Sequence, residues 1–138
     1  MIGAMTHVFP VTVYYEDTDM GGVVYHANYL KFIERARSDW VRRLGIDQNA
    51  LRDAGTVFVI HRIEADFLAP ARLDDLLEVR TRPVGATPAR LVLEQQVWRG
   101  ETCLFKARAT LAAMSAQGRP RRLPSELAQF RETNGGNP

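Results

Sequence analysis

Two aspartates and a histidine are placed so that they could do chemistry on a carbonyl group. Asp17 and Asp19 flank Thr18 in the segment EDTDMGG, and His26 follows shortly after. A helical pattern begins just behind His26, so these side chains would lie near a helix N-terminus. Backbone N–H groups there can polarise a carbonyl and stabilise an oxyanion, while a carboxylate attacks the carbonyl carbon or activates a water. This combination favours a hydrolase for an activated acyl group.

The same residues also have simpler interpretations, which stay open at this point. Acidic residues in front of a helix often only cap it or occupy a turn, and a single histidine such as His26 is commonly structural. Glu34, at the edge of the helix's apolar face, is a rival carboxylate. His61 falls on the apolar face of a predicted strand, which is typical of a core histidine. Cys103 is expected to face the core as an inert apolar residue.

Other kinds of site find little support in the sequence. Asp17, Asp19, His26 and His61 show no spacing typical of metal ligands, so we expect neither a metal nor a cofactor. The chain also lacks a P-loop, a GxGxxG motif and a serine-centred elbow.

The elements that must hold the acidic turn can be predicted from the apolar pattern. Phe9–Tyr15 is rich in β-branched and aromatic residues, which indicates a strand. Tyr29–Leu44 contains no glycine or proline, and its apolar residues cover about half of a helical wheel. Asn28 is a suitable N-cap residue and Gly45 a suitable residue just past the end. A stripe this wide predicts a helix that lies deep against a sheet.

Four strand-like runs follow, and two short helices are expected near Asn49–Asp53 and Ser125–Phe130. The predicted strands are Val57–Phe67, Leu76–Val84, Arg90–Trp98 and Thr102–Met114. Their alternation indicates an antiparallel sheet with one buried face, hence an α+β fold with the helix as its cover. The exposed strand edges favour a symmetric homodimer formed by edge-to-edge pairing. We expect a leader over residues 1–8, a single domain over 9–130 and a flexible tail over 131–138.

Composition narrows the possible partners and the compartment. The net charge of +2 is too small to argue for nucleic acid. Sixteen arginines stand against two lysines, which suits binding of phosphates or carboxylates but also fits a compositional bias. A single cysteine excludes an intramolecular disulfide and fits a reducing compartment. With no signal peptide and no membrane span in the sequence, the expected location is cytoplasmic.

The segment YYEDTDMGGVVYHANYLKFIERAR (residues 14–37) resembles a known family signature. It is similar to that of the hotdog-fold acyl-CoA thioesterases of the 4-hydroxybenzoyl-CoA thioesterase class, and closest to their Tol-Pal-associated (YbgC-type) branch. Met20 stands where alanine is usual. The segments LAPARLDD (residues 68–75) and RPRRLP (residues 119–124) also resemble that branch, so the similarity extends over residues 9–130.

This resemblance implies a fold and a reaction. The fold is the hotdog fold, a long central helix wrapped by a curved antiparallel sheet of about five strands. The reaction converts an acyl-CoA and water into a free acid and coenzyme A. Asp19 would be the catalytic carboxylate, acting as nucleophile or general base. The backbone N–H at His26 would polarise the thioester carbonyl, and the His26 side chain would assist or position the substrate.

The resemblance also implies binding residues and an assembly. The acyl group would lie against Gly22, Val23, Tyr25 and Asn28. Family members form homodimers, often paired into dimers of dimers, with sites at the subunit interface. Basic residues near that interface typically hold the coenzyme A phosphates; the candidates here are Arg90, Arg119 and Arg121, with Arg122 beside them.

Two other functions remain open from the sequence. A non-catalytic module that binds acyl-CoA or acyl carrier protein, within an envelope or lipid-synthesis complex, would not need Asp19. A hotdog hydratase normally pairs an aspartate with a histidine in a later motif, which this sequence does not contain. The sequence does not identify the acyl group, nor does it decide between coenzyme A and acyl carrier protein as its carrier.

Overall fold

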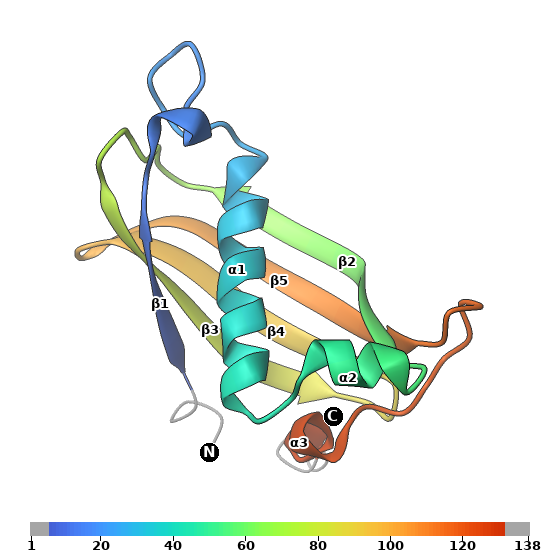
Figure 1. The fold of residues 1–138 in the computed structure, drawn as a ribbon. Coiled ribbons are helices and arrows are strands. Elements are labelled where there is room, and N and C mark those ends of the chain that lie inside the picture. Colours follow the sequence, from blue (N-terminus) through green and yellow to red (C-terminus); the bar gives the residue numbers. More distant parts are fainter. Residues whose placement is uncertain (1–5, 132–138) are drawn as a thin grey trace.

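The computed structural model describes residues 6–131, which contain one antiparallel sheet and three helices. The strands are β1 (His7–Thr12), β2 (Val57–Phe67), β3 (Leu76–Ala86), β4 (Arg90–Arg99) and β5 (Thr102–Met114). The helices are α1 (Asn28–Arg43), α2 (Gln48–Asp53) and α3 (Ser125–Ala128), with a 3₁₀ turn, η2, at Tyr15–Asp17. The five strands are ordered β1-β3-β4-β5-β2, so β1 and β2 are the two edges (Figure 1).

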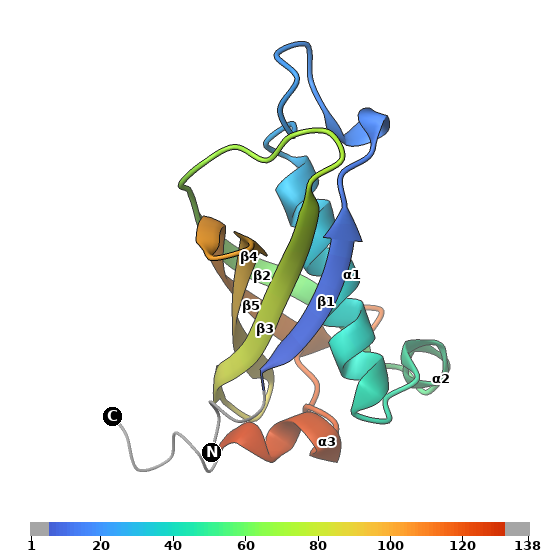
Figure 2. The same cartoon turned by 90° about the vertical axis from the view of Figure 1, so that its left-hand side faces the viewer.

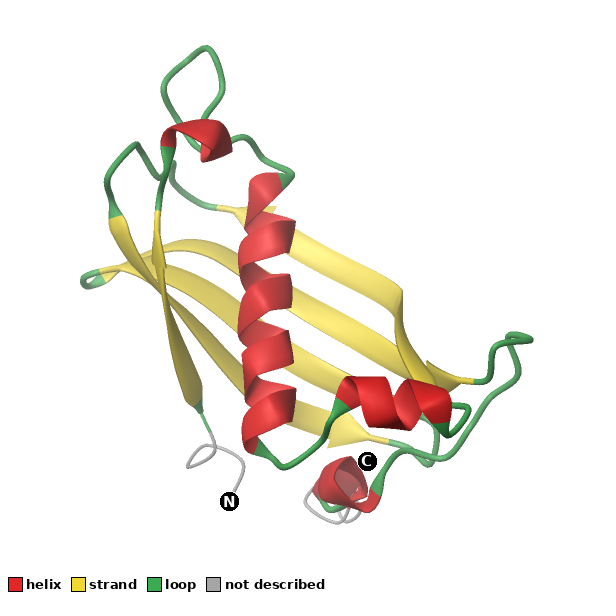
Figure 3. Cartoon of the chain, viewed as in Figure 1, coloured by secondary structure: helices red, strands yellow, loops and turns green. Residues whose placement is uncertain are grey.

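The helix α1 lies across one face of the sheet, and the strands curve around it (Figures 2 and 3). Its inward face is apolar and buried: Tyr29, Phe32, Ile33, Ala36, Trp40 and Val41. The α+β arrangement predicted from the sequence, with a single long helix covering the sheet, is therefore confirmed. Within residues 6–131, no helix combines the length and the hydropathy that crossing a membrane requires.

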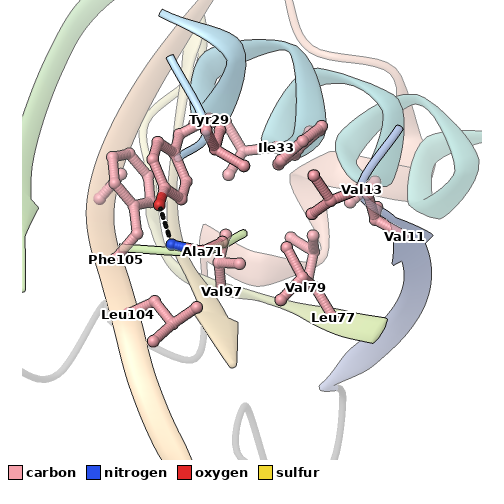
Figure 4. Packing of buried hydrophobic residues seen from close by; sticks show 14 residues of the cluster. Val11, Val13, Tyr29, Ile33, Ala71, Leu77, Val79, Val97, Leu104 and Phe105 are labelled. Atoms are coloured by element: carbon pink, nitrogen blue, oxygen red, sulfur yellow. Dashed lines mark hydrogen bonds between the residues drawn. The ribbon is translucent and has the colours of Figure 1, made fainter. Parts of the chain in front are cut away.

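The core divides into two clusters along α1. The first lies under the beginning of the helix, where the Tyr29 ring stacks on Phe105 with centroids 5.0 Å apart (Figure 4). The second lies under its end, where Trp40 stacks on Phe130 at 5.8 Å and so attaches the segment around α3. The first cluster lies next to the acidic turn. Its member Tyr29 is the second residue of α1, and the helix begins shortly after that turn.

Several predicted boundaries agree with the structure and others shift. The bounds of β2 and β5 are as predicted, and Gly45 has the positive φ of 94° expected just past a helix end. The strand β1 starts two residues earlier than expected, and it ends earlier as well, because the chain turns into η2 at Tyr15. Residues 1–5 and 132–138 of the expected leader and tail lie outside the described residues.

Two side chains differ from their predicted environments. His61 is exposed, because a bulge between Ile60 and Arg62 interrupts the alternation of β2 against β5, so the prediction of a core histidine is wrong. Cys103 is half-buried, and its Sγ lies 3.5 Å from the Phe105 carbonyl oxygen.

Candidate active site

Asp17 holds the acidic turn together from inside. Its side chain is buried, and its Oδ2 accepts a hydrogen bond from the Tyr14 N–H (2.9 Å). Its Oδ1 accepts one from Asn28 Nδ2 (2.9 Å), and its carbonyl accepts one from the Tyr25 N–H (2.9 Å). Asp17 thus connects the end of β1 to the start of α1, and both of its carboxylate oxygens are occupied.

Asp19 faces solvent at the edge of the same turn. Its N–H donates to the Val23 carbonyl (2.9 Å), and its own carbonyl accepts from the Gly22 N–H (3.0 Å). Its Oδ1 accepts a hydrogen bond from the Gly21 N–H at 2.8 Å. Within residues 6–131, Oδ2 of Asp19 has no hydrogen-bond partner. One carboxylate oxygen is therefore fixed by the backbone, and the other is free to react.

The turn is fixed against the segment that follows β2. Val24 donates its N–H to the Ala71 carbonyl (2.8 Å), and Val23 forms an isolated bridge with Arg72. The Ala71 N–H in turn donates to the hydroxyl oxygen of Tyr29 (3.0 Å), as Figure 4 shows. Burial raises the pKa of Tyr29, although this hydrogen bond opposes the rise, so the hydroxyl stays neutral in physiological conditions.

The backbone between the turn and α1 leaves a donor free. The Tyr25 N–H is taken by the Asp17 carbonyl, and the Asn28 N–H by the Tyr25 carbonyl (2.8 Å). The His26 N–H between them has no partner within the described part of the chain. Because it lies at the N-terminal end of a 16-residue helix, the helix dipole strengthens its attraction for a carbonyl oxygen.

A pocket of about 310 Å³ opens beside this donor. It is lined by Val24, His26, Tyr29, Phe67, Leu68, Ala69 and Pro70. The Phe67 ring forms its aromatic wall, with centroids 5.7 Å from Tyr29 and 6.3 Å from His26. The walls are mostly apolar and the donor lies at the rim, which suits an acyl chain whose carbonyl remains at the mouth.

The residues from Phe67 to Pro70 line the pocket, although none of them was a predicted site residue. A signal was present, because the apolar run FLAP continues past the end of β2 with no polar residue to close it. Phe67 and Leu68 are both about half exposed, which is unusual for large apolar side chains outside a binding surface.

The predicted acyl-binding residues divide into two groups. Gly22, Val23 and Tyr25 lie in or next to the turn, and the Tyr25 and His26 rings are in contact, with centroids 4.5 Å apart. Asn28 is buried and bonded to Asp17; it is the first helical residue, and the N-cap is Ala27. The structure therefore gives Asn28 a supporting position in place of the predicted capping role.

The other predicted residues lie away from Asp19 within one chain. Arg90 begins β4, while Arg119 and Arg121 lie between β5 and α3, at the end of α1 opposite the acidic turn (Figure 1). Arg121 lies over Gly55, where an added Cβ would be 2.7 Å from its Nη2. Glu34 is exposed on α1, and its Oε2 accepts a hydrogen bond from the Ser38 hydroxyl (3.0 Å).

Comparison with known proteins identifies the family of this chain. The model of the "Thioesterase superfamily" matches residues 21–105, which begin two residues after Asp19 and include α1, β2, β3, β4 and the start of β5. The "Acyl-CoA thioester hydrolase YbgC" of Escherichia coli O6:H1 is 39% identical over 127 residues, covering 90% of this chain and 95% of the relative. The "Acyl-CoA thioesterase YbgC" of Haemophilus influenzae is 41% identical over 86% of this chain and 89% of its own.

Comparison with solved structures leads to the same family. A probable thioesterase from Bartonella henselae superposes with a TM-score of 0.83 at 40% identity, over 86% of this chain and 99% of that one. The predicted hotdog arrangement is confirmed by these neighbours together with the five-stranded sheet around α1. A family match over more than half of the chain, relatives of similar length and the same fold lead to one conclusion: the chain belongs to the thioesterase superfamily and is a thioester hydrolase.

Proposed function

We propose that this protein hydrolyses acyl-CoA thioesters and that Asp19 is its catalytic carboxylate. The observation that carries the proposal is the free Oδ2 of Asp19 on a turn that the backbone fixes at the N-terminus of α1. The names of the YbgC relatives supply acyl-CoA as the substrate class. Asp17 is two residues away, but it has no free oxygen for chemistry.

The proposed reaction uses two elements of the site. The thioester carbonyl accepts a hydrogen bond from the His26 N–H, which stabilises the negative charge that develops on the oxygen. Asp19 then either attacks the carbonyl carbon, forming an anhydride that water opens, or removes a proton from the attacking water. Coenzyme A leaves as its thiolate in both cases. The His26 side chain and Tyr25 border the acyl group and position it.

A panel of acyl-CoA esters of different chain length, with thiol release as the readout, tests this function. We expect Asp19→Asn to retain the fold and lose turnover, and Glu34→Gln to retain both. Turnover unaffected in Asp19→Asn removes Asp19 from the mechanism, and loss confined to Glu34→Gln assigns catalysis to the helix carboxylate. Tight acyl-CoA binding without thiol release would instead identify a binding module.

A single turnover in ¹⁸O-labelled water separates the two roles of Asp19. General-base catalysis places the label only in the released acid. Nucleophilic catalysis places it in the Asp19 carboxylate when the anhydride opens at the enzyme carbonyl, and mass spectrometry of the peptide that contains Asp19 detects it. The same assay with acyl carrier protein in place of coenzyme A tests the alternative carrier.

We also propose a homodimer that pairs β2 with β2 of a second copy. The strand β2 is an edge of the sheet, and Ile60 and Phe67 expose apolar surface along it. Antiparallel pairing places the end of one β2, at Phe67, beside the start of the other, at Val57. The proposed coenzyme A-binding arginines lie at that second end, so the dimer would bring them near the partner's acidic turn.

A dimer of dimers is proposed on the outer face of the sheet. One row of side chains there alternates in charge across four strands: Arg82, Glu94, Arg108 and Glu64. Such a row is complementary to a copy of itself turned by half a revolution. Sedimentation of the wild type and of Glu94→Lys tests this assembly, since the variant would separate dimers while leaving the β2 edge intact.

We also propose that the protein is located in the cytoplasm. The lone cysteine, Cys103, is free, as expected in a reducing compartment such as the cytoplasm. Residues 9–130 are proposed to act as one domain. Fractionation with an antibody against the native protein tests the location, and limited proteolysis tests the domain limits.

A further inference from the structure

A second pocket lies between α1 and β2, away from Asp19. Its volume is about 200 Å³. Phe58, Val59 and Ile60 give it an apolar wall from β2, while Arg37, Ser38 and Gln48 supply polar groups from the helices. Thioester hydrolysis as described above uses none of these residues.

Arg37 is the unusual member of this pocket. It lies on the buried face of α1 with only 8% of its surface exposed. Its Nη1 donates to Gln95 Oε1 at 2.9 Å, and Gln95 Nε2 donates to the Ile33 carbonyl and to Thr81 Oγ1, both at 2.9 Å. Gln95 and Thr81 are fully buried, so this network holds the Nη1 end of the guanidinium in place before any ligand arrives.

The charge of Arg37 has no acidic partner in contact. Within residues 6–131, no carboxylate oxygen lies within 4.0 Å of it, and Gln95 is its single hydrogen-bond partner. A guanidinium carries five N–H donors. Among the described residues, His7 Nδ1 is the only fully enclosed side-chain polar atom without a partner, so the unused donors of Arg37 have access to the open pocket.

Burial also disfavours the charged guanidinium at this position. It lowers the pKa of Arg37, and the charge of Glu34 opposes that shift from a distance. Glu34 is exposed and accepts the Ser38 hydroxyl, so it does not neutralise Arg37 by contact. An anion in the pocket would supply the missing partner, and burial would strengthen the pair.

We propose that the pocket between α1 and β2 is a binding site for a carboxylate group held by the guanidinium of Arg37. A carboxylate matches the planar donor edge of an arginine, and the apolar wall from Phe58 to Ile60 takes the hydrocarbon part of the same molecule. The small volume limits the ligand to a short acid. Glu34 at the rim repels a second negative charge, so a monocarboxylate is preferred over phosphate.

The carboxylate could have two sources. A free organic acid would bind independently of any hydrolysis. The far end of a dicarboxylic acyl group, still attached to its carrier, would bind only as part of a substrate; this second source rests on the proposed function and on the dimer that adjoins the pocket.

Calorimetric titration of the intact protein with benzoate and with butyrate, and with phosphate as the control anion, tests the site directly. We expect saturable binding of one carboxylate per chain and no phosphate binding. Arg37→Gln should weaken carboxylate binding by roughly tenfold to a hundredfold, the usual value of hydrogen bonds to a charged group. Arg35→Gln removes the same charge from an exposed position of the same helix and should leave binding unchanged.

A second variant covers the case in which Arg37→Gln fails to fold. Ser38→Leu adds an apolar side chain to the pocket without touching the guanidinium, and it should abolish carboxylate binding. The proposal is overturned if the wild type binds neither acid, if it binds phosphate as well as carboxylate, or if Arg37→Gln or Ser38→Leu binds like the wild type.

Two further measurements are needed. The first distinguishes the two sources of the carboxylate, and the second tests whether a second copy of the chain fills the pocket instead. A rise in KM of Arg37→Gln for glutaryl-CoA but not for pentanoyl-CoA assigns the carboxylate to the acyl chain, and equal KM values assign it to a free acid. Sedimentation tests whether Glu34 of a second copy occupies the site: if Arg37→Gln and Glu34→Gln both dissociate the protein and no acid binds, the carboxylate site is refuted. Failure of thioester hydrolysis alone leaves the calorimetric result intact.

Discussion

Asp17→Ala and Asp19→Ala should affect different properties of the protein, although only one residue separates the two aspartates. The first should lower the stability of the fold, and the second should lower the turnover of acyl-CoA. Asp17→Ala removes the acceptor of two hydrogen bonds, from the Tyr14 N–H and from Asn28 Nδ2, in a site only 3% exposed. Hydrogen bonds to a charged group contribute about 1.5–3 kcal/mol each, so the loss of two is roughly 3–6 kcal/mol. For a domain of this size that corresponds to a fall in Tm of roughly 10–20 °C.

The matched variant Asp19→Ala loses one hydrogen bond, from the Gly21 N–H, at an exposed position. Exposed substitutions of this kind change the free energy of unfolding by about 0.5 kcal/mol. Turnover of acyl-CoA should nevertheless fall by about 10²–10⁴-fold, the usual contribution of a catalytic acid or base.

Thermal unfolding and thiol release, both measured on the two variants, test whether Asp17 stabilises the fold and Asp19 carries the reaction. The assay temperature must lie well below the reduced Tm of Asp17→Ala, so that its activity reflects folded protein. The division of roles is refuted if Asp17→Ala unfolds like the wild type, if Asp19→Ala loses as much stability as Asp17→Ala, or if Asp19→Ala keeps its turnover.

Two further predictions concern the supports of the fold. Tyr29→Phe leaves the Ala71 N–H without its acceptor and should lower the free energy of unfolding by about 1–3 kcal/mol in a denaturant titration; an unchanged midpoint would show that this bond contributes nothing. Arg43, through its hydrogen bond, and then His7 lower the pKa of Asp39 in the folded state below its value in the unfolded chain. This stabilisation is present above the unfolded pKa, about 4, and is lost as the pH falls through the folded pKa, so the stability difference between wild type and Arg43→Ala should be largest near neutral pH and vanish in acid. A difference that persists after Asp39 is protonated would contradict that assignment.

The long helix and the strands could be predicted because burial of one face imposes a repeating pattern of apolar residues on the sequence. The apolar stripe of α1 and the alternation in β5 follow directly from facing a core, and the bounds of α1, β2 and β5 agree with the structure to within one residue. The end of β1 could not be predicted, because it depends on the Asp17 carboxylate accepting the Tyr14 N–H. The same limit applies to Asn28, whose partner lies 11 residues away, and to the bulge at His61.

The candidate site was predictable in its turn and not in its pocket. Residue types and spacing identified the acidic turn, but they did not distinguish Asp19 from Asp17; only the resemblance did. The structure supplies a physical difference between them, since one carboxylate is fully bonded and the other has a free oxygen. The wall formed by Phe67 and Leu68 depends on how the chain leaves β2, which no local pattern specifies.

The way in which the acidic turn is closed has a consequence for adaptation. The hydrogen bonds that join Asp19 to Val23, Gly22 to Asp19, and Val24 to Ala71 all run between backbone atoms. The side chain of Met20, at the tip, is fully exposed and takes no part in them. A lineage can therefore exchange the tip residue, and with it the surface that an arriving substrate first meets, without moving the carboxylate. Substitution of Met20 is therefore a change that selection for a new substrate can make first, because it alters no residue of the core.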